Sequence, residues 1–198
     1  NFTLTAQSRN SDGNLTPNFN ASATLNLDSV TYPVTNSTEG TFGNSTMTFS
    51  NGEATQSTDY SEVGSISANV TSSYFGENFT SSSLVIGRFY PADFEISGGQ
   101  SGINMIDGCS VFTYFGEPTL TASYTLTAKN ADGDTTTNYD PNKGYSTPIP
   151  SLIGYAANYN AGSRDVDLPF APSARIGAGT GSGSWVEGVY TYTTSDAS

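Results

Sequence analysis

One strand–turn–strand pattern occurs twice in this chain, and it limits the fold more than any other feature. Residues 124–139 read Tyr-Thr-Leu-Thr-Ala-Lys-Asn-Ala-Asp-Gly-Asp-Thr-Thr-Thr-Asn-Tyr, and residues 2–19 repeat the pattern. Leu4-Thr5-Ala6 matches Leu126-Thr127-Ala128, and Asp12-Gly13 matches Asp132-Gly133. In this alignment the first copy has two more residues before its glycine, which we place in the turn because turns tolerate insertions best. The repeat predicts two related units in tandem.

The residue types around the repeat indicate an all-β chain. Thr, Tyr, Phe and Val are common, and these residues favour a pleated, half-buried surface. The charged residues that line soluble helices are scarce, since Lys and Arg together number only 6. Half of the 198-residue chain is about the size of an immunoglobulin-like domain. We therefore predict an all-β fold of two tandem immunoglobulin-like antiparallel β-sandwiches.

The predicted boundaries follow from strand patterns and glycine content. Residues 1–96 form the first β-sandwich, residues 97–111 a Gly-rich linker, and residues 112–198 the second β-sandwich. Residues 112–118 (Phe-Thr-Tyr-Phe-Gly-Glu-Pro) precede the second hairpin and have no counterpart before the first. We therefore expect the first unit to lack its first strand. Its sandwich is then either truncated or completed by a strand from elsewhere, because an open edge invites pairing.

Charge and cysteine content exclude several classes of partner. The net charge of −12 disfavours nucleic acid and anionic membrane surfaces, since both need clustered Lys or Arg. We expect no membrane insertion, because there is no apolar run of about 18 residues. No signal peptide is visible and the chain starts within a strand pattern, so we expect an internal fragment of a longer exported protein. The one cysteine, Cys109, is either free or bridged outside this chain, which leaves the redox compartment undecided.

No constellation typical of an enzyme is visible. Without His and with one Cys, zinc sites and Ser-His-Asp or Cys-His arrangements are unavailable. Glycosidases need only two carboxylates, but no pair here is framed by aromatic strand ends. Asn130, Asp132 and Asp134 could contribute to a Ca²⁺ loop, although the glutamate that an EF-hand needs is missing. A hairpin turn explains the same residues and is favoured. We predict no catalytic residues and no cofactor, with Ca²⁺ as the alternative.

Aromatic and lysine side chains provide two further candidate sites. Tyr145, Tyr155 and Tyr159 lie in turn-rich sequence, where their rings could stack on sugars instead of filling a core. Lys129 and Lys143 lie near Asn and Asp residues and could form an isopeptide crosslink of the kind found in surface adhesins. No lysine stands in the first copy of the hairpin, which disfavours the crosslink.

An ordered set of segments resembles a known family. The set is Ile86-Gly-Arg-Phe-Tyr-Pro-Ala-Asp-Phe94, Cys109, residues 112–118 and residues 126–139, with looser similarity at Trp185-Val-Glu-Gly-Val-Tyr190. It is similar to the C-terminal region of MshQ-like proteins, which are associated with the mannose-sensitive haemagglutinin type IV pilus. The resemblance implies an exported protein of the bacterial cell surface, linked to pilus assembly or adhesion. It implies no catalytic residues.

Two functional classes follow from these observations. In the first, the chain is a non-enzymatic structural or presenting module that contacts other surface or pilus subunits, with strand addition at the open edge. In the second, it is an adhesin domain that binds carbohydrate or a host surface through aromatic and Gly-rich loops. We expect an extracellular location in both.

Overall fold

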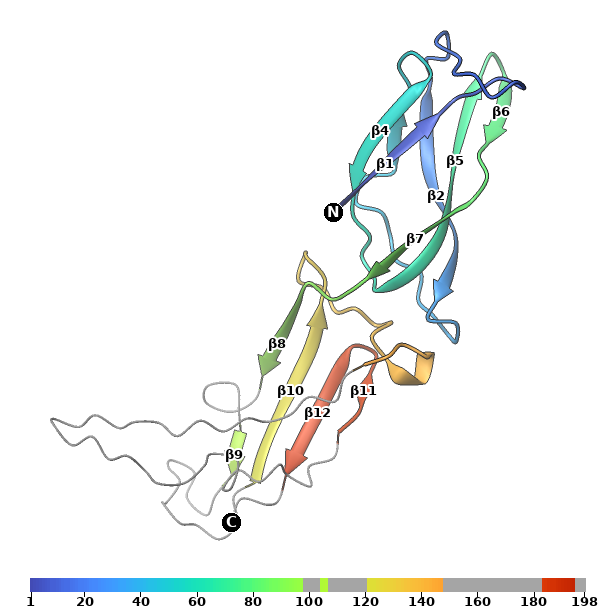
Figure 1. Ribbon diagram of the computed structural model, residues 1–198. Helices are drawn as coiled ribbons and strands as arrows, with labels where there is room; N and C mark the ends of the chain where they lie inside the picture. The colour runs from blue at the N-terminus through green and yellow to red at the C-terminus, as the bar shows by residue number, and fades with distance from the viewer. Residues whose placement is uncertain (98–103, 107–120, 148–182, 195–198) are drawn as a thin grey trace, which may run out of the picture.

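The chain is all-β and its sheets are antiparallel. The computed structural model describes residues 1–97, 104–106, 121–147 and 183–194. Two units lie end to end, unit one comprising residues 1–90 and unit two the described residues from 91 onward (Figure 1). In the described ranges the helical structure is one short 3-10 turn, η2 (Pro141–Lys143), and no helix is long and apolar enough to cross a membrane.

Unit one has two sheets that face each other across a core. The smaller sheet pairs β1 (Phe2–Gln7) with β4 (Glu53–Thr58). The larger sheet has the order β3 (Thr46–Thr48), β2 (Ser22–Tyr32), β5 (Gly64–Tyr74), and the far edge of β5 is shared by β6 (Glu77–Thr80) and β7 (Leu84–Phe89). The core between the sheets consists of Ala23, Met47, Phe49 and Ala54, with Leu4 and Ala6 packed against them.

Unit two has one described sheet, in which β10 (Thr121–Lys129) is central. One side of β10 pairs with β12 (Val189–Thr194), which in turn pairs with β11 (Trp185–Val186). The other side pairs with β8 (Asp93–Ser97) and β9 (Asn104–Ile106). The described residues of unit two thus show one layer, and residues 112–118 lie outside them.

The boundary expected at residue 96 falls inside β8, which pairs with β10 of unit two. Residues 104–106, expected in the linker, likewise form β9 of the same sheet. Phe94 of β8 packs edge-on against Tyr139, with ring centroids 5.5 Å apart. The chain therefore leaves unit one immediately after β7, and its next strand, β8, joins the sheet of unit two.

The repeat is present in the structure, but in a different register from the sequence alignment. Asn10 N–H donates to Asn14 O and Asn130 N–H to Asp134 O, at 2.9 and 2.8 Å. The two turns are therefore equal in length, and equivalent residues differ by 120 in number throughout residues 1–19 and 121–139. Ala6 is thus equivalent to Leu126, and the extra residues expected in the first turn do not exist. A slip of two residues preserves the alternation of a strand, so apolar matching alone could not detect it.

The equivalence continues into the strand pair that follows. Ser8 N–H donates to Gly52 O and Ala128 N–H to Gly188 O, both at 2.8 Å. Gly52 and Gly188 both have a positive φ, 82° and 79°. The T-shaped pair of Phe19 with Phe49 recurs as Tyr139 with Trp185, at centroid distances of 5.0 and 4.8 Å. β1 and β4 of unit one therefore correspond to β10 and β12 of unit two.

Candidate functional site

The Asn-x-Asp-Gly segments are organised as backbone turns by their first asparagine. Asn130 Oδ1 accepts the amides of Asp132 and Asp134 at 3.0 and 2.8 Å, and Asn10 Oδ1 does the same in unit one. Asp132 and Asp134 are exposed. This is the turn geometry that the sequence favours. In the described part of the chain no group of three or more His, Cys, Asp or Glu residues could hold a metal ion, and Cys109 lies outside it.

A buried glutamate joins the two units. Glu62 of unit one is only 7% exposed. Its Oε1 accepts the N–H and the Oγ1–H of Thr137 at 2.9 and 2.8 Å. Its Oε2 accepts the amides of Asn138 and Val63 at 3.1 and 3.3 Å. Three of these four hydrogen bonds come from unit two, so this side chain holds the segment that follows the β10 turn against unit one.

Asn138 makes a second connection on the same side of the junction. Its side chain is fully buried and donates Nδ2–H to Thr38 O at 2.7 Å, while Thr38 N–H donates to Asn138 Oδ1 at 2.7 Å. Lys143, which is 7% exposed, donates Nζ–H to Thr38 Oγ1 at 3.2 Å. Lys129, the other candidate for an isopeptide bond, forms an ion pair with Glu95 at 3.3 Å.

Aromatic residues from both units pack at the centre of the junction. Val63 of unit one belongs to the same buried cluster as Tyr139, Tyr145 and Trp185 of unit two. The Tyr145 hydroxyl donates to Phe89 O at 3.1 Å, and Ser146 N–H donates to the Tyr32 hydroxyl at 2.8 Å. The junction is therefore a continuous core, unlike a flexible linker.

Arg88 lies between two of these rings. Its guanidinium carbon is 4.0 Å from the ring centroid of Tyr32 and 5.8 Å from that of Tyr145, which is cation–π geometry. Tyr145 is 3% exposed, so its ring is not offered to a ligand at the surface. Tyr155 and Tyr159, the other tyrosines considered for sugar binding, lie outside the described residues. Burial raises the pKa of the Tyr145 phenol to about 12, and Arg88 opposes this rise.

Tyr145 should make the junction sensitive to alkali. Its folded pKa lies above the ordinary value of 10.0, so its stabilising contribution is complete below about pH 10 and is lost as the pH rises toward 12. We expect Tyr145→Phe to lower the free energy of unfolding by about 1 kcal/mol at pH 8, through loss of one hydrogen bond. The wild type should lose more stability than the variant as the pH rises to 11.5, so that the difference between them vanishes or reverses. Denaturant unfolding at both pH values measures this, and parallel losses in the two proteins would contradict it. Tyr90→Phe, at a residue that is 69% exposed, is the control.

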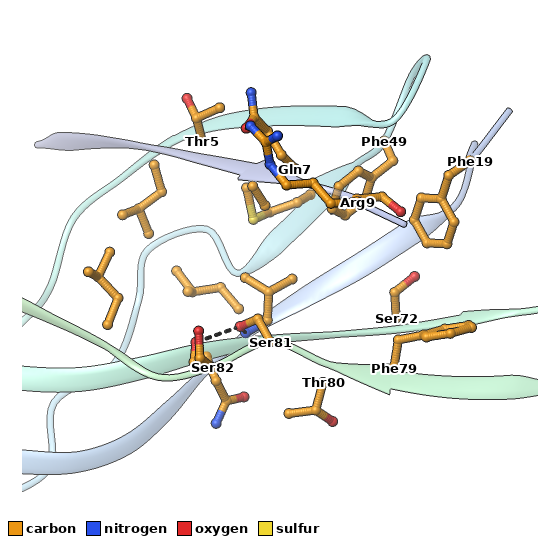
Figure 2. Close-up of a pocket in the computed structure, with 18 of the residues that line it drawn as sticks. Thr5, Gln7, Arg9, Phe19, Phe49, Ser72, Phe79, Thr80, Ser81 and Ser82 are labelled. Carbon is orange, nitrogen blue, oxygen red and sulfur yellow. Dashed lines mark hydrogen bonds between the residues drawn. The ribbon is translucent and has the colours of Figure 1, made fainter. Parts of the chain in front are cut away.

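The outer edge of β1 is a different kind of surface. β1 pairs with β4 on one side, and no described strand pairs with its other side. A cavity of about 770 Å³ lies beside this edge, between β1 and the strands β6 and β7. Figure 2 shows Gln7 and Arg9 above the cavity and Phe79 below it. Its apolar lining comes from both sheets: Leu4, Ala6, Phe19, Leu25, Met47, Phe49, Ala68, Val70, Leu84 and Ile86.

The cavity also has exposed apolar neighbours and a cationic rim. Phe79 and Leu84 are 50% and 58% exposed although they line the cavity. Arg9 donates to Gly13 O at 2.6 Å and to Gln7 Oε1 at 2.5 Å. In the described part of the chain the one ion pair is that of Lys129, so Arg9 lacks a carboxylate partner there. Among the described residues, the outer edge of β1 is therefore unpaired and lies beside an apolar groove.

The sequence did not reveal the residues that form the junction. Glu62 lies in the polar run Asp59-Tyr-Ser-Glu62, which is typical of an exposed turn. One available signal was the repeat itself, since Asn138 and Asn18 occupy equivalent positions. Asn18 is exposed and Asn138 is buried, because only Asn138 has another unit packed on it.

One comparison with known proteins gave a match. A family model described as DUF6701, third domain, matches residues 62–198, which is more than half of the chain. The match begins at the buried glutamate of the junction and includes all of unit two. Comparison with curated proteins and with solved structures gave no match.

Proposed function

The chain belongs to the DUF6701 family, whose third domain it carries, and from this membership and the junction we propose that it is a rigid structural module of an exported bacterial surface protein. In this role the module spaces or presents other domains and carries out no catalysis. The observation that supports it most directly is the buried junction, in which Glu62 and Asn138 bind backbone groups across the two units.

The contacts between the two units differ from those of most tandem domains. Domains joined by small polar contacts move relative to one another by default. Here a buried carboxylate, a buried amide and a shared aromatic cluster connect the units, so a change of angle between them would break several buried hydrogen bonds at once. A module of this kind transmits position and force along its length.

The wider setting is proposed from the resemblance. Similarity to MshQ-like proteins favours an extracellular module that works with pilus or other surface subunits. We also propose that both units are immunoglobulin-like sandwiches. The two facing sheets of unit one and the matching β1–β4 and β10–β12 pairs support this assignment.

The distance between the units tests the proposed rigidity. Spin labels at Ser57→Cys and Thr191→Cys, two exposed positions on β4 and β12, would report that distance in a Cys109→Ser background. We expect one narrow distance distribution from pulsed electron paramagnetic resonance spectroscopy. Asn138→Ala should broaden it, because the reciprocal bonds to Thr38 are lost.

The control for this measurement lies away from the junction. Asn26→Ala removes a side chain that bonds only within unit one, and it should leave the distribution narrow. A broad distance distribution in the spin-labelled protein that keeps Asn138 would reject the proposed rigid module.

A further inference from the structure

We propose that the free edge of β1 in unit one accepts one β-strand that resembles β8 in sequence. The strand would come from a neighbouring unit that is built like unit one and is followed by such a strand, as unit one is followed by β8. This inference deepens the structural role proposed above and rests on it. It names what fills the groove beside β1 and in which register. The two copies of the repeat make this possible, because unit two already shows the occupied form of the same edge.

In unit two, β8 covers the edge that is free in unit one. β10 is the equivalent of β1, and β8 pairs with it antiparallel, with Ile96 opposite Leu126 and Phe94 opposite Ala128. Subtracting 120 from the β10 numbers places an incoming Ile96 opposite Ala6 and an incoming Phe94 opposite Ser8. A strand in this register continues the ladder of β1 without changing its pairing with β4.

The groove provides an aromatic site at the place predicted for the incoming phenylalanine. In unit two, Phe94 packs against Tyr139 and Trp185 with centroid distances of 5.5 and 5.7 Å. The equivalents of those rings are Phe19 and Phe49, and both line the cavity of unit one (Figure 2). An incoming phenylalanine would therefore enter a pocket already lined by two aromatic rings.

The outward side chains are complementary in charge. Lys129 at the end of β10 pairs with Glu95 of β8 at 3.3 Å. Arg9 is equivalent to Lys129 and lies on the rim of the groove, bonded to Gly13 O and Gln7 Oε1. An acidic residue in the middle of the incoming strand would lie beside Arg9, as Glu95 lies beside Lys129.

A second surface of unit one points to the same neighbour. Asn130 and Asn138 of unit two bond to Ser61 and Thr38 at the base of unit one. Their equivalents, Asn10 and Asn18, are exposed at the other end of unit one. Pro17 replaces Thr137 there and lacks its N–H, so the contact equivalent to Glu62 would be weaker. At this end, unit one therefore carries residues that partly match the surface by which unit two docks on unit one.

The chain path explains how one neighbour supplies both contacts. β7 ends unit one at Phe89, and after Pro91 the next residues form β8 of unit two. The unit that provides the docking base thus also delivers the edge strand. The same head-to-tail arrangement, applied once more, places another unit above unit one with its β8-type strand in the groove.

A peptide of residues 91–98, Pro-Ala-Asp-Phe-Glu-Ile-Ser-Gly, is the direct probe. Binding to the 198-residue chain is measured by fluorescence anisotropy, and the site by backbone NMR shifts. We expect saturable binding to a monomer and shifts at Thr5–Arg9. Shifts confined to β10 would mean displacement of the chain's own β8 and would overturn the proposal. If the peptide does not bind and the chain instead self-associates with shifts at Thr5–Arg9, the groove belongs to a second copy and the proposal is overturned.

Backbone methylation of the peptide gives a matched control. Ala128 N–H donates toward the β12 side, to Gly188 O, so by alternation the backbone groups of Thr125 and Thr127 face β8. Glu95, opposite Thr127, therefore uses its N–H in the ladder, whereas Ile96 does not. N-methylation at Glu95 should weaken binding about tenfold or more, and N-methylation at Ile96 far less. Equal effects would show nonspecific apolar binding and would overturn strand addition.

Charge exchange tests the register independently. Arg9→Glu should weaken binding of the unmodified peptide by about fivefold or more, and a peptide carrying Glu95→Lys should restore it. If the exchange restores nothing, the proposed register is wrong. These binding experiments are independent of the spin-label distances across the junction. Failure of strand binding would therefore leave the proposed rigid module intact, and a flexible junction would leave strand binding intact.

Discussion

Gly188→Ala should destabilise unit two by about 3–4 kcal/mol, the largest effect expected for any single substitution proposed for this chain. Gly188 has a φ of 79°, a left-handed conformation that costs an L-residue about 1–2 kcal/mol. A Cβ at this position would lie 2.3 Å from Thr136 O, which is a backbone atom and cannot move freely. Denaturant unfolding monitored by tryptophan fluorescence measures the loss, because Trp185 is in the adjacent strand β11.

Gly133→Ala separates the effect of conformation from that of crowding. Gly133 has a similar φ of 86°, yet nothing lies within 4 Å of a Cβ added there. Gly133→Ala should therefore lower the free energy of unfolding by about 1 kcal/mol, from the left-handed conformation alone. Losses of equal size at Gly133 and Gly188 would contradict the contact with Thr136 O. The same substitution at Gly52, where a Cβ would lie 2.5 Å from Thr16 O, should destabilise unit one in the same way.

The strand content and the repeat could be predicted from sequence because both depend on local patterns. Alternating apolar residues give strands with one buried face, and Asn-x-Asp-Gly gives a turn whose hydrogen bonds involve only neighbouring residues. The register could not be predicted, because a shift of two residues keeps the same face of Leu4 and Ala6 toward the core. The register is fixed by the hydrogen bonds within the two turns and by those that Ser8 and Ala128 donate to Gly52 and Gly188.

The junction could not be predicted because it depends on residues far apart in sequence. Asn138 bonds to Thr38, and no property of either residue alone indicates a partner at that distance along the chain. Tyr145 lies in turn-rich sequence and was therefore considered for sugar binding. Its ring is buried only because unit one covers it, and its hydroxyl donates to Phe89 O. Contacts between units make these residues structural.

The open edge of β1 was expected for a reason that only partly holds. The sequence argument relied on residues 112–118, which precede the second hairpin and lie outside the described residues. The strand that covers the equivalent edge in unit two is β8, which precedes those residues and had been assigned to unit one. Among the described strands, β8 pairs with β10 in unit two, and none pairs with the equivalent edge of β1. The identity of the covering strand required the observed pairing.

Glu62→Ala should cost about 3 kcal/mol and should also loosen the connection between the units. The substitution removes the acceptor of four hydrogen bonds, three of them from Thr137 and Asn138 across the junction. The amide of Asn138 would then be buried without its acceptor, and unsatisfied buried donors cost about 1–3 kcal/mol each. Denaturant unfolding gives the free energy, and the spin-label distance between Ser57→Cys and Thr191→Cys gives the geometry.

Two further variants make this result specific to the buried carboxylate. Glu62→Gln keeps one acceptor oxygen at the same site, so it should lose about half as much free energy as Glu62→Ala. Glu53→Ala removes an exposed glutamate whose side chain bonds to Gln7 within unit one, and its effect should stay within about 0.5 kcal/mol. If Glu62→Ala behaves like Glu53→Ala and the distance distribution stays narrow, the carboxylate does not hold the junction. The rigidity would then come from the other buried contacts between the units, which are the aromatic cluster around Val63 and Tyr145 and the hydrogen bonds of Asn138 with Thr38.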